Sequence, residues 1–404
     1  MNLPKPEHSI ASFVRRNIPL VVTMLIQVSA TGAILAPPAI APALLNQLGV
    51  DSVGIGAYIA TAYIAAALSS VYAAAFIQRW GSIRTSQVAL GFCAVGLLLI
   101  ASLGPFLAAL GAIALGIGYG PITPASSDIL ARTTPADRYA LVFSLKQTGV
   151  PIGGAVAGLA AAPIAVHVGT SSSLIFMAIL CVLAATLGQS LRHQLDNTRA
   201  PSAPWPTRAG FMMPIHMVLS HPGLRVLALC SLVFSAVQMC LSSYLVTYLN
   251  ASLGWTLVAA GAGLAVAQSG GVVGRILWGA VADMTGKTMA TLRALAAAMA
   301  ASSILMVMLQ PSTSPALALT LVCVFGCTAI GWNGVYLAAV ARQAPQGTAG
   351  TATAGCLFFT YIGVVVSAPL FGVLSTALGN MGVGFALLAI PLGVMVFSTR
   401  TMKV

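Results

Sequence analysis

Two basic residues, Arg275 and Lys146, lie inside long apolar stretches of the sequence and are the residues best suited to bind a charged solute. A charge at the centre of a membrane-spanning helix costs at least about 2.5 kcal/mol, so such a residue marks a functional site by default. A guanidinium offers a planar fork of donors that fits a carboxylate, and an ammonium adds a point charge beside it. The two residues therefore predict a site for a small organic anion, with Arg275 as the main ligand and Lys146 assisting.

Each of these two residues also admits a structural interpretation. Arg275 could serve only to hydrogen-bond one helix to another. Lys146 follows Arg138 by about two helical turns, which is close enough to the end of a span for the ammonium to reach the membrane surface. The sequence leaves both interpretations open.

The acidic residues give little support to a cation as substrate. They are few, namely Glu7, Asp51, Asp128, Asp137, Asp196 and Asp283, and the histidines all lie in loops or tails. Only Asp128 falls inside an apolar stretch, and it precedes Arg132 by one helical turn, so a local ion pair is expected. The alternatives for Asp128 are a salt bridge that gates the protein and a carboxylate that accepts a proton. Two interior cations without a central acid favour an anion.

Uncharged polar residues in the apolar stretches are candidates for the walls of the binding site. They are Gln27, Thr31, Tyr119, Gln147, Gln238, Gln268, Trp332, Asn333 and Tyr361. Each one alone could equally form a hydrogen bond between packed helices. The cysteines lie in apolar stretches without a nearby histidine or carboxylate, and no phosphate-binding loop is present. We therefore expect no metal, no cofactor and no catalytic residues.

The composition requires a membrane around these residues. The chain has 404 residues, of which 58% are hydrophobic and 6% are charged, and its mean hydropathy is +0.97. A soluble domain carries roughly 25% charged residues, so a soluble enzyme, a nucleic-acid-binding domain and a disordered protein are excluded. The apolar stretches are too long for the strands of a membrane barrel. The fold class expected is an all-α polytopic membrane protein.

Twelve apolar stretches are each long enough to cross a hydrocarbon core of about 30 Å. They cover 18–45, 53–77, 85–103, 105–131, 139–164, 172–191, 225–249, 255–281, 289–309, 315–341, 348–376 and 381–399. All Lys and Arg residues except Lys146 and Arg275 fall on one side of these spans. This pattern places both termini in the cytoplasm, and the net charge of +12 is then a topology signal and no evidence for nucleic acid.

The two halves of the chain resemble each other. Residues 192–224 form the longest connection and are rich in proline, so we expect a cytoplasmic linker between six-helix bundles at 1–191 and 225–404. Gln78-Arg79-Trp80-Gly81 after the second span matches Asp283-Met284-Thr285-Gly286-Lys287 after the eighth. Arg132 after the fourth span likewise matches Arg342 after the tenth. A parallel repeat of this kind predicts a central cleft that opens to alternate sides.

The loop motif resembles that of the major facilitator superfamily of secondary transporters, and the resemblance extends over essentially the whole chain. Its strongest form is Gly279-Ala-Val-Ala-Asp283-Met-Thr-Gly286-Lys287, whereas the first copy has Ala74 and Gln78 in place of Gly and Asp. In this family the motif holds one gating state through charges at helix ends. The resemblance and the Asp128 pair together give the expected gating residues. These are Arg79, Gly81, Asp128, Arg132, Gly279, Asp283, Gly286 and Lys287.

The family resemblance also bears on the substrate. Spans 1, 4, 7 and 10 line the cavity in this family, and several members that transport anions carry an arginine on this part of span 8, where Arg275 lies. The arginine of span 4 common in proton-coupled members is missing, with Ala112 in its place.

We therefore predict a transporter, and no enzyme, that moves a small organic anion across the inner membrane by alternating access. Proton symport, exchange against another anion and uniport all remain open as the coupling mode, and a monomer in the lipid bilayer is expected. The alternative is an exporter of neutral or amphiphilic compounds in which Arg275 is structural.

Overall fold

The computed structural model describes residues 10–51, 53–134, 142, 145–197, 199–202, 208–345 and 349–398. Every regular element within these ranges is helical. In this part of the chain eleven helices are long and apolar enough to cross a membrane, and a shorter apolar segment, Met381–Phe397, follows them. The twelve predicted spans each correspond to one of these segments. Arg138 and the first residues of the predicted fifth span, 139–141, lie outside the described residues.

The first half of the chain supplies six of these spans. Its helices are α1 (Ile10–Ala39), α2 (Ala41–Leu48), α3 (Val53–Trp80), α4 (Ser82–Ala101), α5 (Pro105–Thr133), α7 (Gly149–Val156), the π-helix η2 (Ala157–Ala161), α8 (Ala162–His167) and α9 (Thr170–Leu195). The predicted first span, 18–45, is divided at Ile40, where the backbone leaves the helical conformation before α2. The fifth span consists of α7, η2 and α8 in succession.

The second half repeats the pattern after a short helix within the predicted linker. Its elements are α10 (Arg208–Ser220), α11 (Pro222–Thr247), the π-helix η3 (Tyr248–Ser252), α12 (Leu257–Thr285), α13 (Thr288–Met306), α14 (Pro315–Ala329), α15 (Asn333–Gln343), α16 (Ala349–Ala377), α17 (Met381–Leu387) and α18 (Ala389–Ser398). The tenth span is divided into α14 and α15, and the twelfth into α17 and α18.

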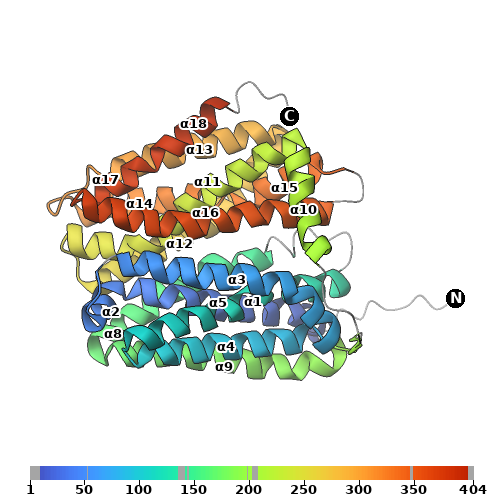
Figure 1. The fold of residues 1–404 in the computed structure, drawn as a ribbon. Helices are drawn as coiled ribbons and strands as arrows, with labels where there is room; N and C mark the ends of the chain where they lie inside the picture. Colours follow the sequence, from blue (N-terminus) through green and yellow to red (C-terminus); the bar gives the residue numbers. More distant parts are fainter. Residues whose placement is uncertain are drawn as a thin grey trace.

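The spans of each half gather into one bundle, and the two bundles lie side by side along their length (Figure 1). Large apolar side chains cover the outside: Leu68, Ile276 and Phe397 expose 60%, 66% and 66% of their surface. Exposure of so much apolar surface to water is unfavourable, whereas contact with lipid chains is favourable. The outer surface therefore agrees with the composition and indicates a protein embedded in a bilayer.

Glycines bring the bundles into contact on the side opposite the start of α1. A Cβ on Gly56 of α3 would lie 2.5 Å from the backbone of Pro369 in α16, and one on Gly158 of η2 would lie 2.4 Å from the carbonyl of Gly261 in α12. Real Cβ atoms do not approach so closely, so only glycine permits these two crossings. We call this pair of crossings the glycine seal.

Candidate functional site

A cavity of about 390 Å³ lies between the two bundles and is walled by both of them. Arg275 lines it, together with the predicted residues Thr31, Tyr119, Gln147, Gln238, Trp332, Asn333 and Tyr361. These side chains come from spans 1, 4, 5, 7, 8, 10 and 11, which the sequence separates widely. The volume is in the range of pockets that hold small organic molecules.

Arg275 reaches from α12 to the first bundle. Its Nη1 donates a hydrogen bond of 2.6 Å to the carbonyl of Gln147, just before α7. That carbonyl would normally accept from the residue four positions later, but this residue is Pro151, which has no N–H. The proline therefore leaves an acceptor at the wall of the cavity, and the arginine of the opposite bundle occupies it.

A second backbone carbonyl accepts a hydrogen bond from the Nε of Arg275. This carbonyl belongs to Ile330 and lies 3.3 Å away. Ile330 is the C-cap residue that follows α14, and the next helix begins only at Asn333, so the break in span 10 leaves this carbonyl open to a side chain. Both partners are uncharged, and the two bonds leave other N–H donors of the guanidinium for a ligand.

No carboxylate neutralises this arginine within the described part of the chain. The Asp51 side chain accepts from the backbone of Val53, and those of Asp128 and Asp196 are engaged at the basic end of the first bundle, described below. The charge of Arg275 thus faces the cavity without an acidic partner among the described residues.

Lys146 lies close to Arg275 but behind the cavity wall. Its side chain is 1% exposed, and its Nζ has no hydrogen-bond partner in the described structure. An unpartnered buried donor lowers the unfolding free energy by about 1–3 kcal/mol. Lys146 therefore does not serve stability, and a functional role is favoured.

The predicted residue Gln27 is likewise buried and does not line the cavity. Its amide donates to Thr31 Oγ1 at 3.2 Å and its oxygen accepts from Thr123 Oγ1 at 3.1 Å. It therefore links span 1 to span 4 and orients Thr31, which does line the cavity.

Gln238 organises the opposite wall. Its oxygen accepts from the indole N–H of Trp332 at 2.9 Å and from the amide of Asn333 at 3.4 Å. The Trp332 ring packs edge-on against Tyr336, with centroids 5.1 Å apart. Trp332 is 1% exposed, so its ring position is fixed by packing as well as by the hydrogen bond.

Several residues of the wall had not been singled out as site residues. They are Tyr63, Thr123, Ser127, Ser235, Ser242, Tyr336, Thr353 and Thr360. Tyr119, Thr123 and Ser127 recur at every fourth position of α5, which places them on one helix face. This spacing is a signal that a search for polar faces, in place of single polar residues, would have found.

A second cavity of about 470 Å³ adjoins the first and shares Thr123, Ser127, Leu357 and Tyr361 with it. Its other walls are mostly apolar and include Pro214 and Ile215 of α10. The shared residues make the second cavity a vestibule of the first, bordered by the linker helix.

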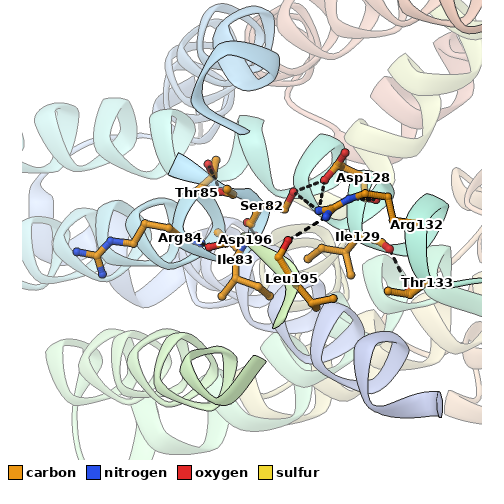
Figure 2. Close-up of polar contacts among 12 residues, drawn as sticks. Ser82, Ile83, Arg84, Thr85, Asp128, Ile129, Arg132, Thr133, Leu195 and Asp196 are labelled. Atoms are coloured by element: carbon orange, nitrogen blue, oxygen red, sulfur yellow. Dashed lines mark hydrogen bonds and ion pairs between the residues drawn. The ribbon is translucent and has the colours of Figure 1, made fainter. Parts of the chain in front are cut away.

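The predicted gate residues Asp128 and Arg132 do meet, in a cluster at the end of the first bundle that carries the loop arginines (Figure 2). Arg132 Nη2 pairs with the Asp128 carboxylate at 2.6 Å, and Ser82 Oγ donates to the same oxygen. Arg132 Nη1 donates to the carbonyl of Leu195 at 2.9 Å. Through these hydrogen bonds the ion pair of α5 is connected to the start of α4 and the end of α9.

Asp196 completes this polar cluster and had no predicted role. Its two carboxylate oxygens accept from the backbone N–H groups of Ile83 and Arg84, at 2.9 and 3.0 Å, and so cap α4 (Figure 2). Gly81 has φ +89°, and a Cβ there would lie 2.2 Å from the Asp196 carboxyl carbon. Gly81 is therefore required both by its backbone conformation and by the cap.

The other predicted gate residues are placed as follows. Gly286 is the C-cap residue after α12 with φ +64°, Lys287 is exposed beside it, and nothing lies within 4 Å of a Cβ on Gly279. Arg79 lines a pocket of arginines. The side chain of Asp283 lies outside the described part of the structure. Their gating roles stay predictions.

Comparison with known proteins identifies the family model that fits the chain. The model described as Major Facilitator Superfamily matches residues 22–368. Comparison with curated proteins finds no match.

Solved structures of transporters share the fold. A POT family transporter in complex with 5-aminolevulinic acid aligns with a TM-score of 0.76 at 13% identity, over 94% of each chain. The nucleoside transporter NupG aligns at 0.75 and 14% identity, over 95% of this chain and 98% of its own. A bacterial homologue of the human lysosomal transporter Spinster aligns at 0.68 and 15% identity, over 95% and 94%. Identities this low establish the fold alone.

Proposed function

The chain belongs to the Major Facilitator Superfamily and is a membrane transporter, and we propose that it carries a small organic anion, a carboxylate, through the cavity that Arg275 lines. The family and the composition fix the class of protein. The substrate is inferred from the chemistry of the cavity.

The observation that carries this proposal is the unbalanced charge at the cavity. Arg275 contacts two neutral carbonyls, the buried Nζ of Lys146 has no partner among the described residues, and the described carboxylates are all engaged elsewhere. Charges removed from water need a counter-charge, because unpaired ions in a low-dielectric interior are strongly disfavoured. A substrate carboxylate supplies that counter-charge at the free N–H donors of Arg275.

The geometry also suggests how binding acts on the two bundles. Arg275 belongs to the second bundle and holds the Gln147 carbonyl of the first. A carboxylate at the remaining N–H donors of the guanidinium adds an attraction between opposite charges that the neutral Gln147 carbonyl lacks. The anion therefore binds where Arg275 bridges the two bundles, so its affinity depends on how the bundles are placed relative to each other, as alternating access requires.

The orientation follows from the positive-inside rule. With Arg79, Arg84, Arg132 and Arg192 in the cytoplasm, the vestibule beside α10 opens toward the cytoplasm and the glycine seal closes the periplasmic side. The structure then corresponds to an inward-facing state of a protein in the inner membrane.

The test is a ligand screen on the detergent-purified protein, because a ligand stabilises the folded state by mass action. The panel holds small mono- and dicarboxylates, neutral solutes and cationic amphiphiles, each tested on the wild type, on Arg275→Lys and on Arg293→Gln. Arg275→Lys keeps the charge but loses the planar fork, and Arg293→Gln removes an arginine remote from the cavity lining. Liposome flux with the stabilising compound then measures transport.

We expect a carboxylate to raise the melting temperature of the wild type and of Arg293→Gln, and to lose at least about tenfold in affinity in Arg275→Lys. Stabilisation by neutral or cationic compounds alone, unchanged in a folded Arg275→Lys protein, contradicts the proposal. That result favours the exporter of neutral or amphiphilic compounds in which Arg275 is structural.

A further inference from the structure

Four arginines and a tryptophan surround a pocket of about 340 Å³ on the basic side of the first bundle, away from the central cavity. Its walls are Arg79, Trp80, Arg84, Val88, Arg192 and Arg199. Arg79 and Trp80 end α3, Arg84 and Val88 lie in the first turns of α4, and Arg192 lies in the last turn of α9. Three helix ends thus converge on one concave, strongly basic surface.

The positive charges of Arg84, Arg192 and Arg199 are poorly compensated by the described residues. Asp196, which lies between Arg192 and Arg199 in the chain, uses both carboxylate oxygens on backbone N–H groups of α4. The side chains of Arg192 and Arg199 form no hydrogen bond or ion pair within the described ranges. The Arg84 side chain points away from Asp128 and Arg132 (Figure 2) and makes one long contact, 3.4 Å, with Gln87.

An apolar strip leads from the pocket along the outside of the bundle. Phe92, Val95 and Leu98 of α4 expose 42%, 51% and 48% of their surface, and Leu183 and Leu187 of the neighbouring α9 expose 52% and 55%. The two helices are joined at the pocket end by Gln87, whose amide donates to the carbonyl of Ala185 at 3.0 Å. A lipid-facing strip therefore ends at the arginines.

Trp80 marks the level of the membrane surface. It is 40% exposed and its ring stacks on Phe76, with centroids 5.0 Å apart. Exposed tryptophans concentrate at the boundary between hydrocarbon and headgroups. The arginines beside it are consequently at the depth where lipid phosphates lie.

We propose that this pocket binds the phosphate of an anionic phospholipid, whose acyl chains lie along the strip formed by α4 and α9. Guanidinium groups suit phosphate because they donate in pairs to its oxygens. A lipid with a net negative headgroup should bind more tightly than a zwitterionic lipid, because each basic residue adds its own attraction to the negative charge. The site is independent of the transported solute and of Arg275.

The test measures lipid binding to the intact purified protein by native mass spectrometry, with phosphatidylglycerol and phosphatidylcholine of equal chain length as probes. The pocket variant is Arg192→Gln/Arg199→Gln. The matched control, Arg225→Gln/Arg293→Gln, removes the same charge from arginines of the second half that lie outside the pocket lining. Glycerol phosphate is added in a further arm as a soluble competitor without acyl chains.

We expect the wild type and the control to prefer phosphatidylglycerol, and the pocket variant to lose about thirtyfold in affinity for it, from two missing arginines. A pocket variant that keeps the preference overturns the proposal. Displacement of the lipid by glycerol phosphate at equal concentration also overturns it, because the ligand is then a soluble phosphate. If the double variant does not fold, Arg84→Gln serves in its place, with a loss of about fivefold expected.

Discussion

The guanidinium of Arg342 donates a hydrogen bond to the hydroxyl of Thr288, 2.7 Å away, and so ties the end of α15 to the start of α13. In the first bundle Arg132 makes the corresponding contact with Ser82 at 3.4 Å, between the end of α5 and the start of α4. The sequence repeat thus returns in the structure as a repeated arginine–hydroxyl contact at equivalent helix ends.

The two copies of the loop motif differ in sequence at the acidic position. The first copy of the loop motif has Gln78 where the second has Asp283. In the first bundle Asp128 of α5 and Asp196 after α9 bring carboxylates to the loop instead. The charge that the loop lacks is supplied from two other places in the chain.

Gly81→Ala should destabilise the protein through the loss of this arrangement. A methyl group there would lie within 2.2 Å of the Asp196 carboxyl group, and alanine tolerates the φ of +89° poorly. Loss of the cap and backbone strain together should cost about 2–4 kcal/mol of unfolding free energy. Thermal unfolding of the purified protein measures this as a lowered melting temperature.

The control is Gly279→Ala, at another glycine of the motif, which lies inside α12 with nothing within 4 Å of a Cβ there. Alanine favours a helix over glycine by up to about 1 kcal/mol, so the melting temperature should stay or rise. An equal drop in melting temperature for the two variants would show that the motif glycines stabilise the protein for a shared reason. The Asp196 contact would then not explain the effect at Gly81.

Gly158→Val should shift the protein away from the state described here. A Cβ on Gly158 would lie 2.4 Å from the carbonyl of Gly261, so valine forces apart the bundles at the glycine seal. A cysteine introduced at Ser127, which lines the cavity, should then react faster with an impermeant maleimide added from the side of the seal.

Gly91→Val is the matched control for the seal, because nothing lies within 4 Å of a Cβ at this position of α4. Its labelling rate should equal that of the Ser127→Cys protein alone. An unchanged rate in folded Gly158→Val would mean that the crossing of η2 and α12 does not hold the cavity closed.

How far the sequence predicts this molecule depends on the distance between interacting residues along the chain. The spans follow from apolar runs of local sequence, and the Asp128–Arg132 pair follows from a separation of one helical turn. The cap of α4 by Asp196 joins residues 113 positions apart, and no local pattern marks it. Only the packing of α9 against α4 brings these groups together.

In the central site, too, some features could be predicted from local sequence and others could not. Arg275 is conspicuous in the sequence because a charge in an apolar run is rare. Its partners are backbone carbonyls, which every residue carries, so their selection at Gln147 and Ile330 depends on where helices are interrupted. Pro151 was visible in the sequence, but the arginine that uses the acceptor it leaves belongs to the other bundle.

Pro151→Ala should loosen Arg275. Alanine restores the N–H that the Gln147 carbonyl lacks, and this helical bond competes with the 2.6 Å bond from Arg275 Nη1. The proposed carboxylate should then bind about tenfold more weakly, because the guanidinium is held less firmly. The ligand-dependent shift in melting temperature measures the affinity.

Pro163→Ala, in α8 of the same span, controls for the removal of a proline as such. Its affinity for the ligand should match the wild type, since Pro163 does not line the cavity. Wild-type affinity in Pro151→Ala would show that the carbonyl contact does not position Arg275.

Lys146→Met should make the protein more stable and less able to bind its anion. Methionine fills a similar volume, and it removes a buried Nζ that has no hydrogen-bond partner in the described structure. Relief of this unsatisfied donor should raise the unfolding free energy by about 1–3 kcal/mol. Loss of a positive charge beside Arg275 should weaken carboxylate binding, so the two quantities move in opposite directions. Thermal unfolding with and without ligand measures both in one experiment.

Higher stability of Lys146→Met with unchanged affinity for the carboxylate would mean that Lys146 does not contribute to anion binding. Lower stability would mean that Lys146 has a structural partner.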